Sequence, residues 1–445
     1  MLFKQKQFQS NKEPQVRAKA DGIAEAMKAM NCQAAGIAEH DLACGIDLLK
    51  ELQEKHKMVW LSMNLTGPDK KKSIFAPYIT TKISGLNVAI LGITDEQDIT
   101  EKEGEYSILP WQDTLPKVVA KVGKKVDMTI LLSSYPYQVN KEIAENVAGI
   151  NLILASGHAA SSHDPYKVNN TLIAQTRTRG KHLGMLQIDW TKAKQWRKKP
   201  LNRIRMEEDR LNGINQQLAR MEKREKKAKL SKNKQYKKLL ADKKQSSNQI
   251  KKLKKSIGKE AEKEKMCDFT NRFIALESSL PEDPKVQKII NRTIQEVNQL
   301  NKNQTATLDD RQTASLQDLA GWEKCQECHQ PQVAFWQKTG HAQAWSTLEK
   351  KNQQFNEECL LCHVTLPYYD VAKVKAANLL LMLPKKLKTV GCETCHGSAL
   401  AHSEKQEAVP VARPDEKICE TCHTPDHDDN FVFSDKMKLI RCPTN

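Results

Sequence analysis

The first 190 or so residues change repeatedly between helical and strand-like patterns of apolar positions. Apolar side chains recur every three or four residues in some segments, which predicts amphipathic helices, and form short unbroken runs in others, which predicts buried strands. The helical patterns cover residues 18–30, 45–56 and 140–147, and the strand patterns cover 58–63, 86–93, 128–132 and 151–155. This alternation favours a layered α/β architecture.

The segment 193–305 has helical periodicity and few aromatic residues. Two apolar stripes run along it, on either side of a turn-like stretch at 230–233. The stripes consist of Leu211, Ile214, Leu218 and Met221, and of Leu239, Ile250, Leu253 and Ile257. They predict an antiparallel helical hairpin of coiled-coil type. Residues 268–302 are expected to continue as two helical pieces broken at Pro281 and Pro284.

The positive charge of the chain is concentrated in this middle segment. The whole chain of 445 residues has a formal net charge of +17, and residues 192–265 alone hold 27 Lys or Arg against 9 Asp or Glu. One interpretation is a solvated spacer. The other is a cationic arm for an anionic surface, such as lipid headgroups, an envelope polymer or an acidic redox protein. Nucleic acid is not expected as a partner, because aromatic side chains for base stacking are nearly absent.

The pattern Cys-x-x-Cys-His occurs four times in the C-terminal part of the chain. The paired cysteines are Cys325 and Cys328, Cys359 and Cys362, Cys392 and Cys395, and Cys419 and Cys422, and the following histidines are His329, His363, His396 and His423. This spacing is the attachment signature of c-type haem, in which two thiols bond the haem vinyl groups and the next His ligates the iron. A pair of zinc sites is the alternative, but zinc does not require a His after every second Cys. The sequence therefore predicts four covalently bound haem c groups.

Each haem iron has a second axial position, and few histidines are left to fill these positions. Beyond the four motif histidines, the segment 306–445 contains His341, His402 and His427. Low-potential electron-transfer haems usually take a second His, so three irons are expected to be closed by two histidines and one to be open. The remaining iron could be five-coordinate or could bind Met382, Met437, a Lys or a His of the first domain. Cys442 is more plausible as a bystander than as a thiolate ligand.

The four remaining cysteines have no regular spacing. They are Cys32, Cys44, Cys267 and Cys442, and we expect them to be scattered free thiols rather than a disulfide framework.

The C-terminal segment resembles the tetrahaem cytochrome c-554 family. The resemblance rests on the run from Trp336 to Leu348 that contains His341, on the segments around the second and third motifs with His402 shortly after, and on Cys419–Thr424. It implies that His341 and His402 ligate haems other than their neighbours, and that three haems are bis-histidine and one is five-coordinate. It also implies electron transfer between redox partner proteins. A haem enzyme that reduces a small nitrogen or oxygen species at an open iron is the alternative.

The N-terminal segment resembles calcineurin-like metallophosphoesterases of the 5'-nucleotidase type. Residues 38–45, Ala-Glu-His-Asp-Leu-Ala-Cys-Gly, are similar to the family's Gly-Asn-His-Glu-Phe-Asp-x-Gly box, and residues 130–134, 152–160 and 180–189 are similar to later family segments. Several metal ligands of the family are missing. Its Asn is replaced by Glu39 and one of its His residues by Ser134, while His40 and His158 remain. A two-metal hydrolase needs the full cage, so we expect a non-catalytic scaffold; a redox-linked phosphohydrolase is the alternative.

Together these patterns predict three parts: a degenerate metallophosphoesterase-like α/β domain at 1–192, a basic helical hairpin or linker at 193–305, and a mainly helical tetrahaem cytochrome domain at 306–445. Because about 125 residues cannot surround four porphyrins with a conventional core, helices there are expected to be short and strands few. Haem attachment of this type takes place outside the cytoplasmic membrane, so we expect a periplasmic or other extracytoplasmic location. No secretory signal precedes the first domain, so a signal peptide is expected upstream of this chain.

Overall fold

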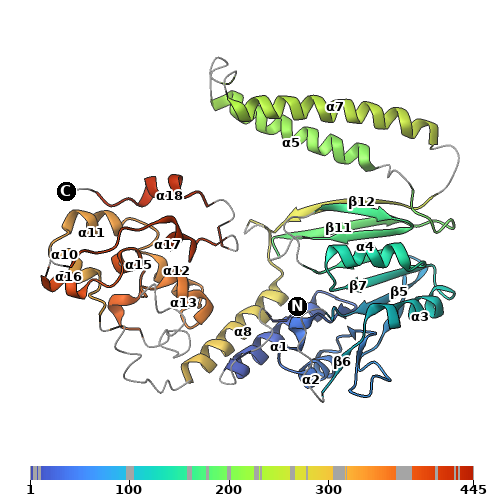
Figure 1. Ribbon diagram of the computed structural model, residues 1–445, viewed down its shortest axis with the longest axis horizontal. Coiled ribbons are helices and arrows are strands. Elements are labelled where there is room, and N and C mark those ends of the chain that lie inside the picture. The colour runs from blue at the N-terminus through green and yellow to red at the C-terminus, as the bar shows by residue number, and fades with distance from the viewer. Residues whose placement is uncertain are drawn as a thin grey trace. The chain divides into compact units, whose positions relative to one another are not determined.

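The computed structural model divides the chain into two compact units, and each is described by itself below (Figure 1). The first contains residues 33–42 and 53–281, and the second contains residues 2–32, 43–52 and 282–445. The structure describes residues 2–3, 8, 12–96, 105–157, 163–176, 180–197, 202–224, 230, 233–260, 266–276, 279–303, 316, 318–366, 383–405, 409–424, 427–428 and 431–443.

A six-stranded sheet forms the centre of the first unit. The strand order is β4-β5-β7-β8-β10-β9, and the four inner strands are parallel while the two edge strands are antiparallel to their neighbours. The strands are β4 (Tyr78–Ile83), β5 (Leu86–Ile93), β7 (Met128–Ser133), β8 (Leu152–Ala155), β9 (His163–Val168) and β10 (Thr171–Gln175). The α/β expectation is confirmed, and the apolar runs at 86–93, 128–132 and 151–155 form three of the inner strands.

Alternate side chains of the inner strands enter two different cores. Helices α3 (Trp111–Gly123) and α4 (Tyr137–Asn146) connect parallel strands, and their Leu115 and Ile143 pack with Leu131 of β7 on one face of the sheet. On the other face, Met128 of β7 packs with Trp196 and its neighbours. Burial on both faces explains why these strands read as continuous apolar runs rather than as alternating ones.

Several short elements lie outside this sheet, and one of them, α2, belongs to the second unit up to residue 52. They are β1 (Ala35–Gly36), the 3-10 helix η2 (Glu39–Leu42), α2 (Ile46–His56), β2 (Trp60–Leu61), β3 (Leu65–Thr66) and β6 (Ser107–Ile108). Strand β1 pairs with β2 in parallel, and β3 pairs with β6 in antiparallel fashion. The predicted strand at 58–63 is therefore short, and the predicted helix at 45–56 is confirmed as α2, whose residues 53–56 fall in the first unit.

A two-stranded ribbon packs on the second face of the sheet. Strands β11 (His182–Asp189) and β12 (Asp268–Ala275) pair in antiparallel fashion along all eight residues of each (Figure 1). The expectation of helix from residue 268 onward is therefore wrong for residues 268–275. The cause is the ribbon: Phe269 is buried against Trp196 with ring centroids 5.9 Å apart, and the backbone of β12 bonds to a strand far upstream.

The basic helical hairpin is inserted between these two paired strands. Helices α5 (Asn202–Arg224) and α7 (Lys234–Glu260) pack against each other between Asp189, where β11 ends, and Asp268, where β12 begins (Figure 1). Asn233 starts α7, because its side-chain oxygen accepts hydrogen bonds from the backbone of Gln235 and Tyr236. Among the apolar positions named above, Ile214, Leu218, Ile250 and Leu253 are buried. The predicted hairpin is confirmed, as an insertion within the first unit.

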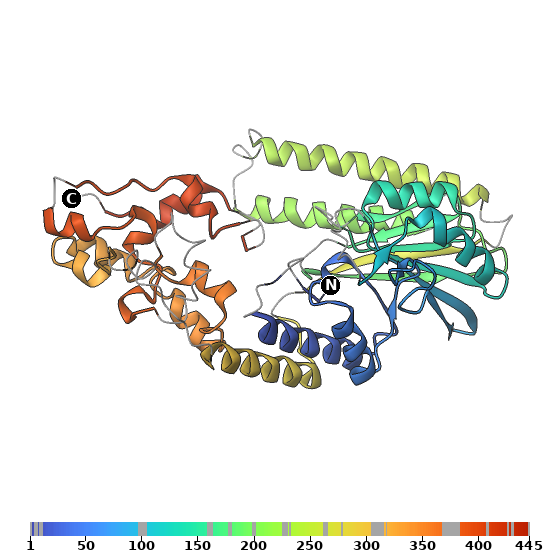
Figure 2. The same ribbon diagram turned by 60° about the horizontal axis from the view of Figure 1, so that its bottom comes forward.

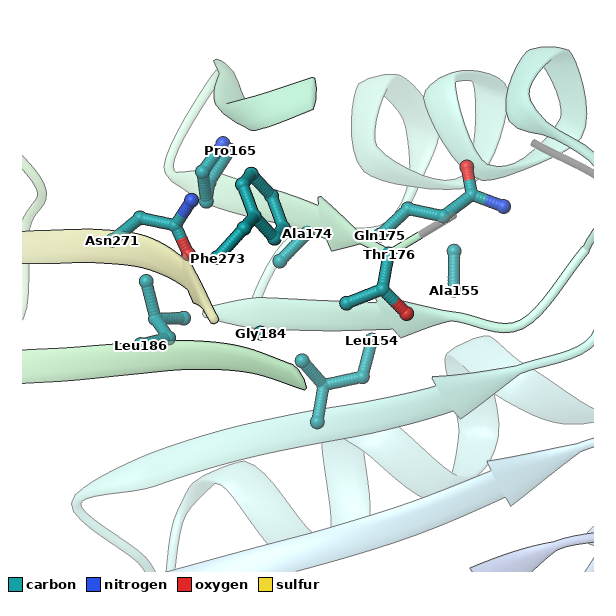
Figure 3. A pocket seen from close by; sticks show the side chains of 10 residues that line it. All are labelled: Leu154, Ala155, Pro165, Ala174, Gln175, Thr176, Gly184, Leu186, Asn271 and Phe273. Atoms are coloured by element: carbon teal, nitrogen blue, oxygen red, sulfur yellow. The ribbon is translucent and has the colours of Figure 1, made fainter. Parts of the chain in front are cut away.

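A small hollow lies between the sheet and the ribbon. Its volume is about 150 Å³, and its lining includes Leu154 of β8, Gln175 of β10, Leu186 of β11 and Phe273 of β12 (Figure 3). Ligand sites in proteins typically have volumes of about 300–1,000 Å³. The hollow is smaller than this and mostly apolar, so we assign no ligand to it.

Two long helices from distant parts of the sequence pair in the second unit. Helix α1 (Glu13–Ala29) packs against α8 (Pro284–Asn303), as both views show (Figures 1 and 2). Gly22 permits the close approach, because a Cβ at this position would lie 2.1 Å from Oγ1 of Thr293. Glu25 forms an ion pair with Arg292 on the same pair of helices. The N-terminal helix therefore belongs to the unit that holds the cysteine motifs.

The rest of the second unit consists of short helices joined by irregular segments. They are α10 (Trp322–Gln326), α11 (Gln330–Trp336), α12 (Ala344–Lys350), α13 (Glu357–His363), the 3-10 helix η5 (Lys385–Leu387), α15 (Cys392–His396), α16 (Leu400–Lys405), α17 (Glu416–Glu420) and α18 (Phe433–Ile440). The described residues after β12 form no strand. Short helices and few strands were expected, and this expectation is confirmed.

The apolar core of this region is small. Among the described residues, seven buried side chains form it, namely Leu319, Leu348, Leu360, Val364, Leu366, Leu383 and Leu387. Within the described parts of the whole chain, no helix is both long and apolar enough to cross a bilayer.

Candidate functional site

Each Cys-x-x-Cys-His motif lies on or next to a short helix. The third motif fills α15 completely, and the second occupies the C-terminal end of α13. The first begins in α10 and ends at His329, the residue before α11. The fourth begins in α17 and ends three residues after it, at His423. One helical turn places the two thiols and the following imidazole of a motif close together, which is what attachment of one flat macrocycle requires.

The motifs also meet one another in pairs. The thiol of Cys325, in the first motif, is hydrogen-bonded to that of Cys392, in the third. This bond lowers the pKa of Cys325, with burial acting in the opposite direction. The thiol of Cys422, in the fourth motif, is bonded to that of Cys362, in the second, and the bond lowers the pKa of Cys422 to about 6. The cysteine pairs of the first and third motifs are therefore neighbours, as are those of the second and fourth.

The remaining thiol of the third motif, that of Cys395, is partly buried. Burial raises the pKa of Cys395 to about 11. None of the twelve cysteines forms a disulfide in the structure. The thiols of the four motifs are thus available for other bonds.

Two motif histidines face a histidine from elsewhere in the sequence. The rings of His329 and His402 are nearly parallel, with centroids 6.3 Å apart and planes inclined by 18°. The rings of His341 and His423 have centroids 6.1 Å apart and planes inclined by 66°. In each pair one ring belongs to a motif and the other is one of the three additional histidines of this region.

These separations fit two imidazoles on opposite sides of one metal atom. A bond from imidazole nitrogen to a metal such as zinc is about 2.0–2.1 Å long, and the ring centroid lies about 1 Å beyond the nitrogen. Two such rings across one metal are then about 6 Å apart by the same geometry. Aromatic rings in direct stacking or edge contact have centroids about 4.5–7 Å apart, a range that also includes both distances. The observed distances are those at which an iron fits between the rings.

In four histidines the ring nitrogen Nδ1 is hydrogen-bonded to an oxygen atom. The Nδ1 atoms of His363, His396 and His402 lie 2.8, 2.9 and 2.8 Å from the backbone carbonyls of Ala344, Ala412 and Val409. Because a carbonyl oxygen carries no proton, Nδ1 must donate. In the neutral ring this leaves the lone pair on Nε2, the atom that then ligates a metal.

The fourth of these histidines has a carboxylate as its acceptor. Nδ1 of His423 lies 3.1 Å from Oδ2 of Asp428, and the ammonium group of Lys436 lies 3.0 Å from the same oxygen. A carboxylate behind an imidazole fixes its orientation and raises its basicity as a ligand. On the opposite side, burial lowers the pKa of His341, as does the nearby His423. Both effects favour the neutral imidazole, which is the ligating form.

The histidines therefore fit the group that the motifs predict. His329 and His402 would hold one iron, and His423 and His341 another. His363 and His396 have the same engaged Nδ1 atom but, within the described residues, no imidazole ring faces them. His427 is exposed and Met437 is partly buried, while Met382 lies outside the described residues. Cys442 is exposed. The role of His427 as a ligand stays a prediction.

The residues that resemble phosphoesterase ligands lie in the first unit. His40 is on η2, and its buried Nδ1 has no hydrogen-bond partner. Ser134 follows β7, and its hydroxyl accepts a hydrogen bond of 2.8 Å from the backbone of Asp95, so it serves the local backbone. His158 lies outside the described residues. Across the described part of the chain, no group of three or more His, Cys, Asp or Glu side chains is arranged around a common metal position.

The two regions of the chain resemble different known proteins. Residues 324–397 match the family model of cytochrome c554 and c-prime. The matched range contains the first three Cys-x-x-Cys-His motifs and His341, and it ends just before His402. This C-terminal region is therefore cytochrome-like, and the family implies covalently bound haem c.

The N-terminal region is similar to nucleotide phosphoesterases. It is 27% identical over 157 residues to the trifunctional nucleotide phosphoesterase protein YfkN of Bacillus subtilis, an alignment that covers 33% of this chain and 10% of the relative. The chain thus spans about a tenth of the length of that relative. The layered α/β unit is accordingly metallophosphoesterase-like.

Solved structures with related descriptions were also found. The sulfate thiohydrolase SoxB of Thermus thermophilus matches with a TM-score of 0.36 and 21% identity, over 39% of this chain and 33% of the other. A 5'-nucleotidase precursor, also of Thermus thermophilus, matches with a TM-score of 0.35 and 21% identity, over 39% of each chain. The NAD nucleotidase NadN of Haemophilus influenzae has a TM-score of 0.35 and 20% identity, over 39% of each chain.

Several residues of the site were not recognised from sequence. The carbonyl acceptors of Ala344, Val409 and Ala412 act through the backbone, so their side chains give no signal. Asp428 lies in a short acidic loop, and its position five residues after His423 was the available signal. Glu393 lies inside the third motif, at a position where Cys-x-x-Cys-His allows any residue.

Proposed function

We propose that this chain is a multihaem c-type cytochrome that transfers electrons between redox partner proteins in the cell envelope. The observation that carries the proposal is the pairing of motif and non-motif histidines, His329 with His402 and His423 with His341, at ring separations of 6.3 and 6.1 Å. Four Cys-x-x-Cys-His motifs and the cytochrome family match support it.

The chain's contribution is to attach, orient and separate its cofactors. A bound haem c supplies an iron that takes up and releases one electron. The paired thiols hold each ring, and the Nδ1 bonds of His363, His396, His402 and His423 aim Nε2 at the metal position. Because these acceptors fix the imidazoles in advance, little rearrangement is needed when the charge of the site changes by one unit.

The contacts between motifs support a compact arrangement of the cofactors. Cys325 meets Cys392, and Cys362 meets Cys422, so attachment sites that are far apart in sequence are adjacent in space. Four haem groups with short separations form a chain of one-electron carriers. In this arrangement the cofactors complete the small apolar core around Leu360 and Leu387.

An extracytoplasmic location follows from the chemistry of attachment. Haem of this type is joined to Cys-x-x-Cys-His outside the cytoplasmic membrane in bacteria. We place the protein in the periplasm or on another outer face of the cytoplasmic membrane. The phosphoesterase-like unit then acts as a scaffold or docking surface for redox partners.

One observation favours a second candidate function. Within the described residues, no imidazole faces His363 or His396, although the Nδ1 atoms of both rings are bonded in the manner of ligands. An iron held by one of them with an open position opposite would bind a small nitrogen or oxygen species. Reduction of nitric oxide or hydroxylamine is the reaction class that such a site would support.

The two functions are separated by spectroscopy and turnover on the matured protein. For an electron carrier we expect reversible reduction of all haems, and no turnover of nitric oxide or hydroxylamine with a reduced dye as electron donor. Sustained dye oxidation that depends on either substrate, together with a high-spin haem signal, would establish the enzyme instead. Phosphatase activity with added manganese or zinc, measured on a chain extended upstream of Met1, would contradict the scaffold role.

A further inference from the structure

The two helices of the inserted hairpin differ strongly in exposed charge. On α5 the described charged residues are of both signs, with Glu207, Glu208 and Glu222 beside Arg210. On α7 the exposed charged side chains that the structure describes are all lysines, namely Lys237, Lys238, Lys243, Lys244, Lys251 and Lys252, and Asp242 is partly buried. The excess positive charge of the hairpin is therefore presented mainly by one helix.

Three of the exposed lysines of α7 form a row on the side away from α5. Ser246, Ile250 and Leu253 are buried and mark the side that faces α5. At 3.6 residues per turn, Lys237, Lys244 and Lys251 lie on the opposite side, one every two turns and about 10 Å apart. Lys252 adjoins this row, and Leu240, which is 42% exposed, lies between its first two members. We call this the lysine face of α7.

The lysine face has no carboxylate partners in the described structure. None of its lysines forms an ion pair with a described residue, although ion pairs occur elsewhere, as between Lys194 and Asp127. Paired charges of both signs are the usual solution for a solvated helix. A row of lysines without counter-charges repels itself, and an anionic surface relieves that repulsion.

We propose that the lysine face of α7 docks on a bilayer that contains anionic phospholipid. Lys presents a point charge on a flexible stem, which suits a fluid array of phosphate headgroups, whereas bidentate recognition of a fixed carboxylate or phosphate favours Arg. Leu240 offers an apolar contact at the headgroup boundary. Both ends of the hairpin continue into the paired strands β11 and β12. Docking therefore holds the whole first unit at the membrane surface.

The test uses the full, haem-loaded chain and vesicles of phosphatidylglycerol in phosphatidylcholine. We expect the protein to sediment with these vesicles at low salt and not with vesicles of phosphatidylcholine alone. Raising the ionic strength from about 0.1 M to about 1 M shortens the Debye length from about 10 Å to about 3 Å and should release the protein. Binding that ignores headgroup charge, or no binding at low salt, overturns the proposal.

Charge-reversal variants test whether the lysine face is the surface that binds the vesicles. Changing Lys237, Lys244 and Lys251 together to Glu should weaken vesicle binding at least about tenfold. The matched control changes Lys117, Lys121 and Lys124, which are exposed on and just after α3, to Glu with the same change in net charge. This control should retain most of the binding. Equal losses in the two variants would mean that net charge alone drives binding, and would contradict the proposal.

Two further measurements check that the variants fold and whether an acidic protein, rather than lipid, binds the lysine face. Far-ultraviolet circular dichroism and the haem spectrum should be the same for both triple variants, and substitution of the same lysines by Gln gives a second, milder version. A protein that ignores vesicles but binds immobilised polyglutamate through the lysine face would have an acidic protein as its partner, and the lipid assignment would be wrong.

A second inference rests on two motifs of identical sequence. The third and fourth motifs both read Cys-Glu-Thr-Cys-His, from Cys392 to His396 and from Cys419 to His423. The two glutamates have opposite environments: Glu393 is 1% exposed, and Glu420 is exposed on the surface. The motif itself therefore does not require a buried carboxylate at this position.

Glu393 is held by three backbone N–H groups from two other segments. Its Oε1 accepts hydrogen bonds of 2.9 Å from Ala320 and 2.8 Å from Ala399, and its Oε2 accepts one of 2.8 Å from Gly321. Gly321 precedes α10, which leads into the first motif and His329. Ala399 precedes α16, which carries His402. One carboxylate thus ties together the two segments that bring His329 and His402 face to face.

We infer that Glu393 is a positioning residue for the His329–His402 ligand pair, an inference that rests on the proposed cytochrome function. A buried carboxylate that accepts several N–H bonds holds its partners more firmly than neutral hydrogen bonds do. Glu393→Gln preserves size, but its amide group turns an NH₂ toward a backbone N–H, so at least one of the three bonds is lost. The ligand pair should then be held less tightly.

Glu393→Gln and its twin Glu420→Gln are compared as matured holoproteins. We expect both to carry all their haem, but Glu393→Gln alone to shift the low-spin electron paramagnetic resonance signal and the midpoint potential of one haem. Identical spectra and potentials in the two variants overturn the inference. If neither variant nor the wild type carries haem, the proposed function itself fails. If Glu393→Gln loses haem, Glu393→Asp, which keeps the charge, should restore it.

Discussion

His329 and His402 face each other with ring centroids 6.3 Å apart, although 73 positions separate them in the sequence. The hydrogen bond from His402 Nδ1 to the carbonyl of Val409 orients its Nε2, and the backbone contact of Leu400 with Asp318, at 3.2 Å, joins the segments that carry the two rings. Sequence proximity plays no part in this pairing. Tertiary structure alone brings His402 to the first motif.

Removal of His402 or His341 should leave one haem iron with an open axial position. For His402→Ala and for His341→Ala we expect one low-spin haem to become high-spin while total haem content stays constant, because the thioether bonds do not depend on the distal ligand. Electron paramagnetic resonance and near-infrared magnetic circular dichroism measure the change. His56→Ala, in the first unit, is the control and should leave the spectra unaltered. A spectrum of His402→Ala that matches the wild type would exclude His402 as a ligand.

The carboxylate of Asp428 should tune the haem held by His423. Asp428 accepts from Nδ1 of His423 at 3.1 Å, so Asp428→Asn removes a negative charge and weakens the imidazole as a donor. Both effects disfavour the more positive ferric state, and the midpoint potential of one haem should rise. Spectroelectrochemical titration measures it.

The control for this prediction is another aspartate close by in the sequence. Asp435 is exposed and pairs with Lys438 at 2.8 Å on the same helix, α18. Asp435→Asn removes the same charge, so it should move the potential far less than Asp428→Asn. Equal shifts would mean that the field of the surface charge, and not the bond to His423, sets the potential.

Two glycines in helices should respond oppositely to substitution by Ala. A Cβ on Gly22 would lie 2.1 Å from Oγ1 and 2.9 Å from Cβ of Thr293, and an atom so near the backbone of α8 cannot move aside. Overpacking of this kind costs about 1–3 kcal/mol, more than the gain of up to about 1 kcal/mol in helix propensity. Gly213 on α5 has no atom within 4 Å of the added carbon. Gly22→Ala should destabilise the second unit, and Gly213→Ala should be neutral or stabilising.

Thermal unfolding followed at the haem absorption band measures the stability of the second unit. Far-ultraviolet circular dichroism follows unfolding of the whole chain. A Gly22→Ala variant as stable as the wild type would show that α1 and α8 are not packed as closely as the structure has them.

The sequence predicted chemistry better than it predicted spatial arrangement. The unbroken apolar runs at 86–93 and 128–132 form strands β5 and β7, because burial on both faces of the sheet leaves a continuous apolar pattern. Residues 268–275 were assigned to helix, because the partner of β12 lies upstream of the whole inserted hairpin and local periodicity has no access to it. The insertion itself was not foreseen for the same reason.

In the candidate site, too, local patterns could be predicted from the sequence, whereas contacts between distant segments could not. The Cys-x-x-Cys-His spacing is local, so it is legible from residues 325–329 alone. Counting histidines indicated which residues were available as second ligands, but not that His402 faces the first motif and His341 the fourth. The contrast between Glu393 and Glu420 cannot be read from two identical pentapeptides, since it arises from segments that fold over one motif and not over the other.

The central claim is that haem is covalently attached at the four motifs. The most direct test is the intact mass of the denatured full chain after expression in a host with c-type maturation machinery, together with its pyridine haemochrome spectrum. We predict a mass that exceeds the polypeptide by four haem groups, and a loss of one group when Cys419 and Cys422 are both changed to Ala. A colourless product with the mass of the polypeptide alone would contradict the account.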